Sequence, residues 1–97
     1  MKKMEFRLKC VRGSLLRDGR VYTVRGYDMW SEYVEVDGVG RCFRKHVIEI
    51  TCKEDLLKFL RWSGFGSVDE WWAAIESFCA GKRKWLYYVF IRNGVGE

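Results

Sequence analysis

Alternation of apolar and polar residues dominates the first half of the chain. A period of two places successive side chains on opposite faces of a strand. The pattern predicts strands over residues 4–10, 20–26, 32–36 and 41–50. Ser14 is expected to cap a single helical turn between the first two strands. Asp37-Gly38, followed by Gly40, predicts a hairpin between the last two strands.

The second half changes to the spacing of helices. The segments TCKE and SVDE, which begin at Thr51 and Ser67, have the form of capping boxes and predict two helix starts. Apolar residues at helical spacing then predict helices over about 52–62 and 68–79. Residues 85–92 are apolar at nearly every position, which is typical of a strand buried on both faces inside a sheet.

The order of these elements predicts an α+β fold. The strands are expected to form a small, partly closed β-barrel with two helices packed against it. The 97 residues are too few for two separate cores, so residues 1–97 are predicted to form a single domain. The apolar runs are too short to span a membrane, and no membrane partner is expected.

Positive charge is concentrated at the two ends of the chain. The formal net charge is +5, with eight of the 18 Lys and Arg residues in 1–25 and four in 81–97. If the final strand lies beside an early strand, both basic ends form one positive face that suits a polyanion. RNA or single-stranded nucleic acid is therefore the candidate partner.

The cysteines do not have the spacing of a zinc ribbon or a redox motif. No two of them form a C-x-x-C pair, and Cys42 and His46 lack an evident fourth ligand for zinc. Buried free thiols in a reducing compartment are expected instead, which predicts a cytoplasmic protein with no metal and no cofactor. Gln is absent and Asn93 is the one Asn, a composition compatible with a heat-adapted source.

Two segments resemble the ASCH domains of the PUA-like superfamily. Residues 19–25, GRVYTVR, are similar to the family signature G-x-K-x-x-T-x-R. Residues 64–71, GFGSVDEW, look like the beginning of the family's second helix, and residues 85–92 look like its final strand. Glu54-Asp55 and Leu56-Leu57 look like the family's acidic helix, and together the similar segments span most of the chain in the expected order.

This resemblance implies a β-barrel with a cleft between the signature strand and the helical layer. PUA-like proteins generally bind RNA or modified bases there, and some ASCH members are small hydrolases or nucleases. Thr23 and Arg25 match the signature threonine and arginine, while Arg20 stands near the position of its lysine. Glu54 is the candidate acidic partner. Because arginine stays protonated and cannot replace lysine as a base, the sequence favours binding over hydrolysis.

The first half alone also resembles small Src-homology-type barrels of phage proteins. Residues 16–24, LRDGRVYTV, are similar to the L-x-x-G-x-x-Y-x-V core of those proteins. This second resemblance also implies a small barrel, but with a function that is unknown or directed at a protein.

We therefore predict a nucleic-acid-binding module, with RNA as the first choice of ligand. Tyr27 and Trp30, in a polar loop between strands, are the best candidates for stacking on bases. The other predicted contact residues are basic, with one threonine: Arg20, Thr23, Arg25, Arg41, Arg44, Lys45, Lys82, Arg83 and Lys84. Strand alternation alone places Arg20 opposite Thr23 and Arg25, so a bend would be needed to bring all three together.

Two other functions stay open at this point. One is a small hydrolase or nuclease acting on modified nucleosides or RNA, for which Glu54 is the only catalytic residue that can be named. The other is a viral protein-interaction adaptor that uses exposed aromatic side chains.

Overall fold

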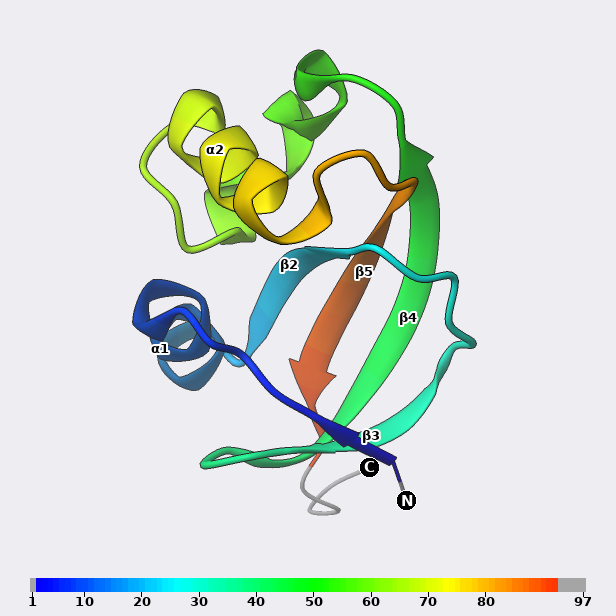
Figure 1. Cartoon of the computed structure of the whole chain (residues 1–97). Coiled ribbons are helices and arrows are strands. Elements are labelled where there is room, and N and C mark those ends of the chain that lie inside the picture. The colour runs from blue at the N-terminus through cyan, green and yellow to red at the C-terminus, as the bar shows by residue number, and fades with distance from the viewer. Residues whose placement is uncertain (1, 93–97) are drawn as a thin grey trace.

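The chain folds into a five-stranded mixed sheet with three helices (Figure 1). The computed structural model describes residues 2–92. The strands are β1 (Lys2–Met4), β2 (Arg20–Arg25), β3 (Glu32–Val36), β4 (Gly40–Ile50) and β5 (Lys84–Ile91). The helices are α1 (Lys9–Asp18), the 3₁₀-helix η1 (Lys53–Trp62) and α2 (Val68–Cys79). The predicted α+β class is confirmed.

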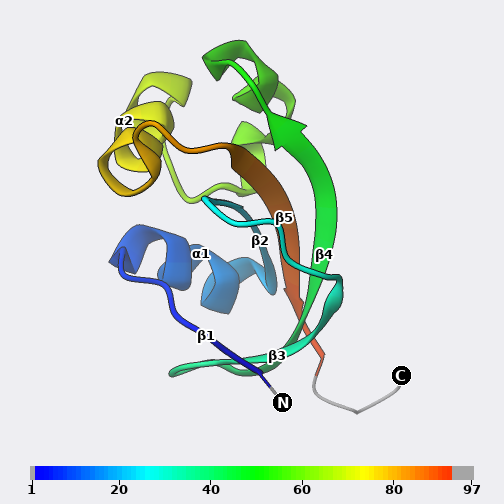
Figure 2. The same ribbon diagram turned by 45° about the vertical axis from the view of Figure 1, so that its right-hand side comes forward.

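Strand β5 lies inside the sheet, as its apolar sequence predicts. The strand order is β1-β3-β4-β5-β2, with β5 antiparallel to both of its neighbours and β1 parallel to β3. The sheet is open, because β1 and β2 form its two edges and do not pair with each other. The barrel closure expected from the sequence is therefore not seen between these strands. Figure 2 shows α1 and α2 one above the other beside β2.

Two clusters of buried side chains pack against opposite faces of β5. Val89 packs in the cluster that contains Leu15 of α1. Leu86 packs with Leu56 of η1 and Ile75 of α2 in the second cluster. Each fully buried aliphatic side chain of this kind stabilises the fold by about 1.5–3 kcal/mol relative to exposure. The final strand therefore joins the two halves of the molecule through its alternating side chains.

The strand predicted over residues 4–10 is wrong beyond Met4. In the β1–β3 register Met4 lies opposite Val36, where β3 ends in the hairpin turn, so residues after Met4 have no strand to pair with. The chain instead enters α1, a helix of ten residues rather than the single turn predicted. Ser14 lies buried inside this helix and donates a hydrogen bond to Asp18, so it is not a cap.

The other strands agree with the sequence pattern. The hairpin between β3 and β4 forms at the predicted place, with Gly38 at φ +78° and Gly40 at φ +114°. Strand β4 is irregular, as its imperfect alternation suggests, and its pairing with β5 shifts between His46 and Ile48. This shift gives β4 the local distortion of a β-bulge.

The first capping box is displaced by one residue from its predicted position. The Asp55 carboxylate, rather than that of Glu54, accepts hydrogen bonds from the backbone N–H of Thr51 (3.0 Å) and of Cys52 (3.3 Å). These hydrogen bonds hold the pKa of Asp55 below its ordinary value. At the second helix the predicted start and its serine cap are confirmed, because the Ser67 side chain accepts a hydrogen bond from the backbone N–H of Glu70 at 3.1 Å.

Within residues 2–92 no helix is long and apolar enough to cross a membrane.

We expect Gly64→Ala to destabilise the fold more than Gly19→Ala. Both glycines have positive φ, +88° and +75°, which costs an alanine about 1 kcal/mol or more. A Cβ at Gly64 would also lie 2.7 Å from the carbonyl oxygen of Cys10, whereas nothing lies within 4 Å at Gly19. Urea unfolding should give losses of about 3 kcal/mol for Gly64→Ala and about 1 kcal/mol for Gly19→Ala. Equal losses would contradict the close approach of this turn to α1.

Candidate functional site

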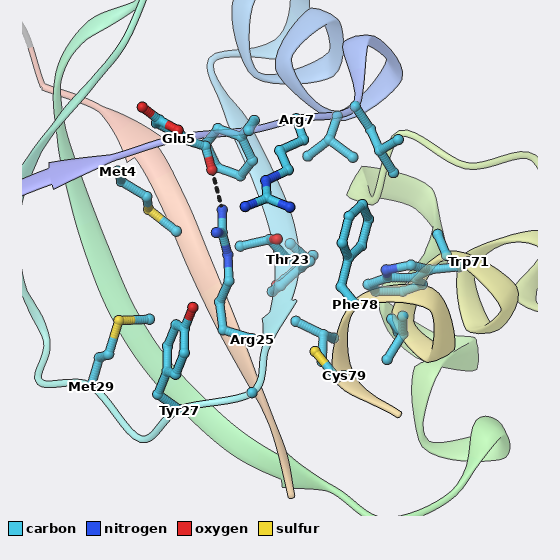
Figure 3. Close-up of a pocket in the computed structure, with 18 of the residues that line it drawn as sticks. Met4, Glu5, Arg7, Thr23, Arg25, Tyr27, Met29, Trp71, Phe78 and Cys79 are labelled. Atoms are coloured by element: carbon cyan, nitrogen blue, oxygen red, sulfur yellow. Dashed lines mark hydrogen bonds between the residues drawn. The ribbon is translucent and has the colours of Figure 1, made fainter. Parts of the chain in front are cut away.

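A pocket of about 610 Å³ opens beside the edge strand β2. Its lining comes from the N-terminal segment 3–8, from residues 22–27, and from the side of α2 that carries Trp71 and Phe78. Figure 3 shows Arg25 and Thr23 between this α2 wall and an opposite wall that includes Met4, Tyr27 and Met29. We call this cavity the β2 pocket.

Arg25 is the central charged group of the β2 pocket. Its Nη2 donates a hydrogen bond to the backbone oxygen of Glu5 at 2.8 Å, and its guanidinium lies 5.0 Å from the ring centroid of Phe6. Among the described residues it forms no ion pair with a carboxylate. Burial lowers the pKa of Arg25, and the nearby positive charges of Arg44 and Arg7 lower it further. The pocket therefore contains a cation that lacks a compensating charge.

Two further cations line the same pocket and come from opposite ends of the chain. Arg7 is exposed and lies 5.8 Å from the ring centroid of Phe78. Lys82 follows α2, and its Cδ approaches Gly26 so closely that a Cβ there would lie 3.2 Å away. The expected meeting of the two basic ends thus occurs at the β2 pocket.

Arg44 also lines the pocket, but it has a structural role. Its side chain is only 3% exposed and donates through Nη2 to the carboxylate of Glu32 at 3.2 Å and to the backbone oxygen of Trp30 at 3.0 Å. The guanidinium lies 5.7 Å from the ring centroid of Tyr87. Its Nε has no hydrogen-bond acceptor within the part of the chain that is described.

The side chain of Tyr87 anchors the loop between β2 and β3 through hydrogen bonds to its backbone. The Tyr87 hydroxyl accepts a hydrogen bond from the backbone N–H of Met29 at 2.6 Å and donates one to the backbone oxygen of Tyr27 at 2.7 Å. Asp28 and His46 approach each other at 3.1 Å beside the same loop. The side chains of Tyr27 and Trp30 are 61% and 82% exposed, so this loop presents aromatic rings to solvent.

The structure divides the predicted contact residues between several places. Thr23, Arg25, Tyr27, Arg44 and Lys82 line the β2 pocket. Arg20, Arg41 and Lys45 lie on the opposite face of the strands, as alternation from Thr23, Arg25 and Arg44 requires. Trp30 lies in the β2–β3 loop outside the pocket lining.

The remaining predicted residues, Arg83, Lys84 and Glu54, do not line the β2 pocket. Arg83 makes two hydrogen bonds to the Glu49 carboxylate, at 2.8 and 2.9 Å. Lys84 lies 3.6 Å from the carboxylate of Glu76. Glu54 is exposed in the first turn of η1 and does not line the β2 pocket, so it is not placed to act there as a base.

Sequence reasoning missed several residues of this pocket. Arg7 belongs to the basic N-terminal segment, but the strand predicted over 4–10 gave it only a solvated face. Phe78 follows Trp71 by seven residues and so lies beside it at the margin of the apolar stripe of α2, and this spacing was the available signal that the two rings share a wall. Trp71 is a buried core residue, and it also contributes to the pocket wall.

The cysteines differ in part from the expected buried state. Cys42 and Cys79 are buried, whereas Cys10 and Cys52 are exposed, and all four are free. Burial raises the pKa of the Cys42 thiol to about 11, so this group is protonated and unreactive at neutral pH.

No family model matches this chain, and comparisons with curated proteins and with solved structures give no significant match.

Tyr87→Phe should loosen the β2–β3 loop without disrupting the sheet. The ring is retained, but the hydrogen bonds to Met29 and Tyr27 are lost, which should reduce the free energy of unfolding by about 1–3 kcal/mol. Hydrogen exchange at the Met29 amide should become faster. The control is Tyr88→Phe on the neighbouring residue, whose side chain lies on the other face of β5.

A pH titration of the same two variants gives a second measurement. Burial raises the pKa of Tyr87 above its ordinary value of 10.0, so the folded state holds this proton more tightly than the unfolded state. Stability should therefore fall as the pH rises above about 10, and Tyr87→Phe should lose that part of the fall. An unchanged pH profile and an unchanged Met29 exchange rate would contradict this role of Tyr87.

Proposed function

We propose that this chain is a nucleic-acid-binding module that holds a phosphate and a base of RNA in the β2 pocket. The observation that carries the proposal is the guanidinium of Arg25, which is half-buried and forms no ion pair with a carboxylate among residues 2–92. A buried charge without a partner is costly, and a bound anion would offset that cost.

The chemistry of the pocket fits a nucleotide better than a simple anion. Arginine can donate two parallel hydrogen bonds to phosphate, and Arg7 and Lys82 supply further positive charge at the mouth. Phe78 and Trp71 give the α2 side an aromatic wall against which a base can pack.

The resemblance to ASCH domains belongs to the same proposal. Thr23 and Arg25 are the two residues that match the family signature, and both line a cavity between β2 and α2. This agrees with the cleft that the resemblance implies, although the strands leave the sheet open. A PUA-like relationship is proposed on this basis, and a cytoplasmic location is proposed from the free cysteines, which suit a reducing compartment.

Arg7→Gln should weaken RNA binding, whereas Arg83→Gln should not. Both changes remove one exposed guanidinium. Arg7 lines the β2 pocket, whereas Arg83 lies outside it and is paired with Glu49. Titration of fluorescein-labelled oligouridylate at several salt concentrations gives the affinity and its salt dependence. Loss of one phosphate contact should reduce the slope of log K against log[salt] by about 0.7 to 1.

Two results would overturn the pocket as the RNA site. One is the absence of binding to any RNA or DNA at low salt. The other is an equal loss of affinity in Arg7→Gln and Arg83→Gln, which would indicate a response to net charge alone.

A further inference from the structure

A continuous row of aromatic rings crosses the sheet on the side away from Arg25. From η1 to β3, the rings are those of Phe59, Tyr22, Tyr88, Phe90, Phe43 and Tyr33. The centroids of successive rings are 5.0–5.7 Å apart. We call the part of this row that lies on the strands, from Tyr22 to Tyr33, the aromatic face.

The aromatic face is accessible to solvent. Tyr33 is 37% exposed, and the other four rings are partly exposed. None of the five belongs to the two buried clusters, although Tyr22 packs at the margin of the second. Large contiguous exposed apolar surfaces are uncommon on proteins without a partner, so this face is a candidate binding surface.

Cations surround the rings. The guanidinium of Arg41 lies 4.5 Å from the ring centroid of Tyr33, and that of Arg20 lies 4.4 Å from the ring centroid of Trp62 at the η1 end. Lys45 is exposed and lies opposite Tyr88 in the β4–β5 register. Arg61, also exposed, lies 4.9 Å from the Trp62 ring.

Fewer acidic than basic side chains lie near the aromatic face. Glu35 lies opposite Arg41 in the β3–β4 register, and Asp18 is engaged by Arg17 at 3.1 Å. The face therefore combines flat apolar rings with a net excess of positive charge.

We propose that the aromatic face binds single-stranded nucleic acid, with bases stacked on its rings and phosphates beside Arg20, Arg41 and Lys45. Every base has a flat face, so stacking on aromatic side chains tolerates any sequence, and the flanking cations follow the backbone. A duplex cannot use the rings in this way, because its bases are already stacked and paired. Charge complementarity thus favours a single strand as the occupant rather than a protein.

This surface is separate from the β2 pocket. Tyr22 and Arg20 lie on one face of β2, and Thr23 and Arg25 lie on the other. The inference goes beyond the proposed pocket function. Tyr22 belongs to both sites, but Tyr33, Arg41 and Lys45 do not line the pocket, so either proposal can fail without the other.

The test is titration of fluorescein-labelled oligothymidylate, alone or annealed to oligoadenylate. The wild-type chain should bind the single strand at least fivefold more tightly than the duplex at the same salt concentration. Tyr33→Thr should weaken single-strand binding about fivefold or more, because stacking on that ring is lost while the strand-forming tendency is kept. Tyr33→Phe should retain the affinity.

Two lysine variants separate local contacts from net charge. Lys45→Gln should weaken single-strand binding and its salt dependence, whereas Lys9→Gln, in the first turn of α1, should leave both unchanged. Equal losses in the two variants would overturn the proposal, as would equal affinity for strand and duplex or wild-type binding by Tyr33→Thr. A fall in affinity for Tyr33→Thr but not for Arg7→Gln would support the aromatic face and reject the pocket.

Discussion

Insertion of β5 between β2 and β4 is the constraint on which the rest of the structure depends. The strand is antiparallel to both neighbours, and its alternating side chains enter two separate clusters, with Val89 in one and Leu86 in the other. Because the last strand pairs with one of the first, the contacts that close the fold are distant in the sequence. The same pairing brings Lys82, from the C-terminal basic segment, close to Gly26, so that the two basic segments meet at the β2 pocket.

The same alternation explains why the positive charge does not form one surface. Residues two apart along β2 share a face, so Thr23 and Arg25 line the pocket while Arg20 lies behind it. Strand β4 repeats this division, with Arg44 toward the pocket and Lys45 beside Tyr88. A composition that suggests one cationic surface therefore gives two, with different shapes and different aromatic neighbours.

Elements with a strong local pattern could be predicted from the sequence, and elements decided by distant pairing could not. The apolar run of β5 and the Ser67 cap identify their own structures without reference to the rest of the chain. Residues 5–10 alternate like a strand, but β3 ends at Val36 and leaves them without a partner. Within the candidate site, Thr23 and Arg25 could be predicted because they match the signature that residues 19–25 resemble. Arg7 was not, because its place in the pocket depends on where the chain turns after β1.

Arg25 and Arg44 show why burial of a cation is not by itself a sign of binding. Both guanidiniums lie near the β2 pocket, yet Arg44 is paired with Glu32 and holds the backbone oxygen of Trp30. Its charge is compensated within the protein, so its role is to fix the loop. Within residues 2–92, Arg25 donates to the carbonyl of Glu5 and lies over the ring of Phe6, and it pairs with no carboxylate. A carbonyl offsets less of a positive charge than a carboxylate does, so the charge of Arg25 is less fully compensated within the protein than that of Arg44.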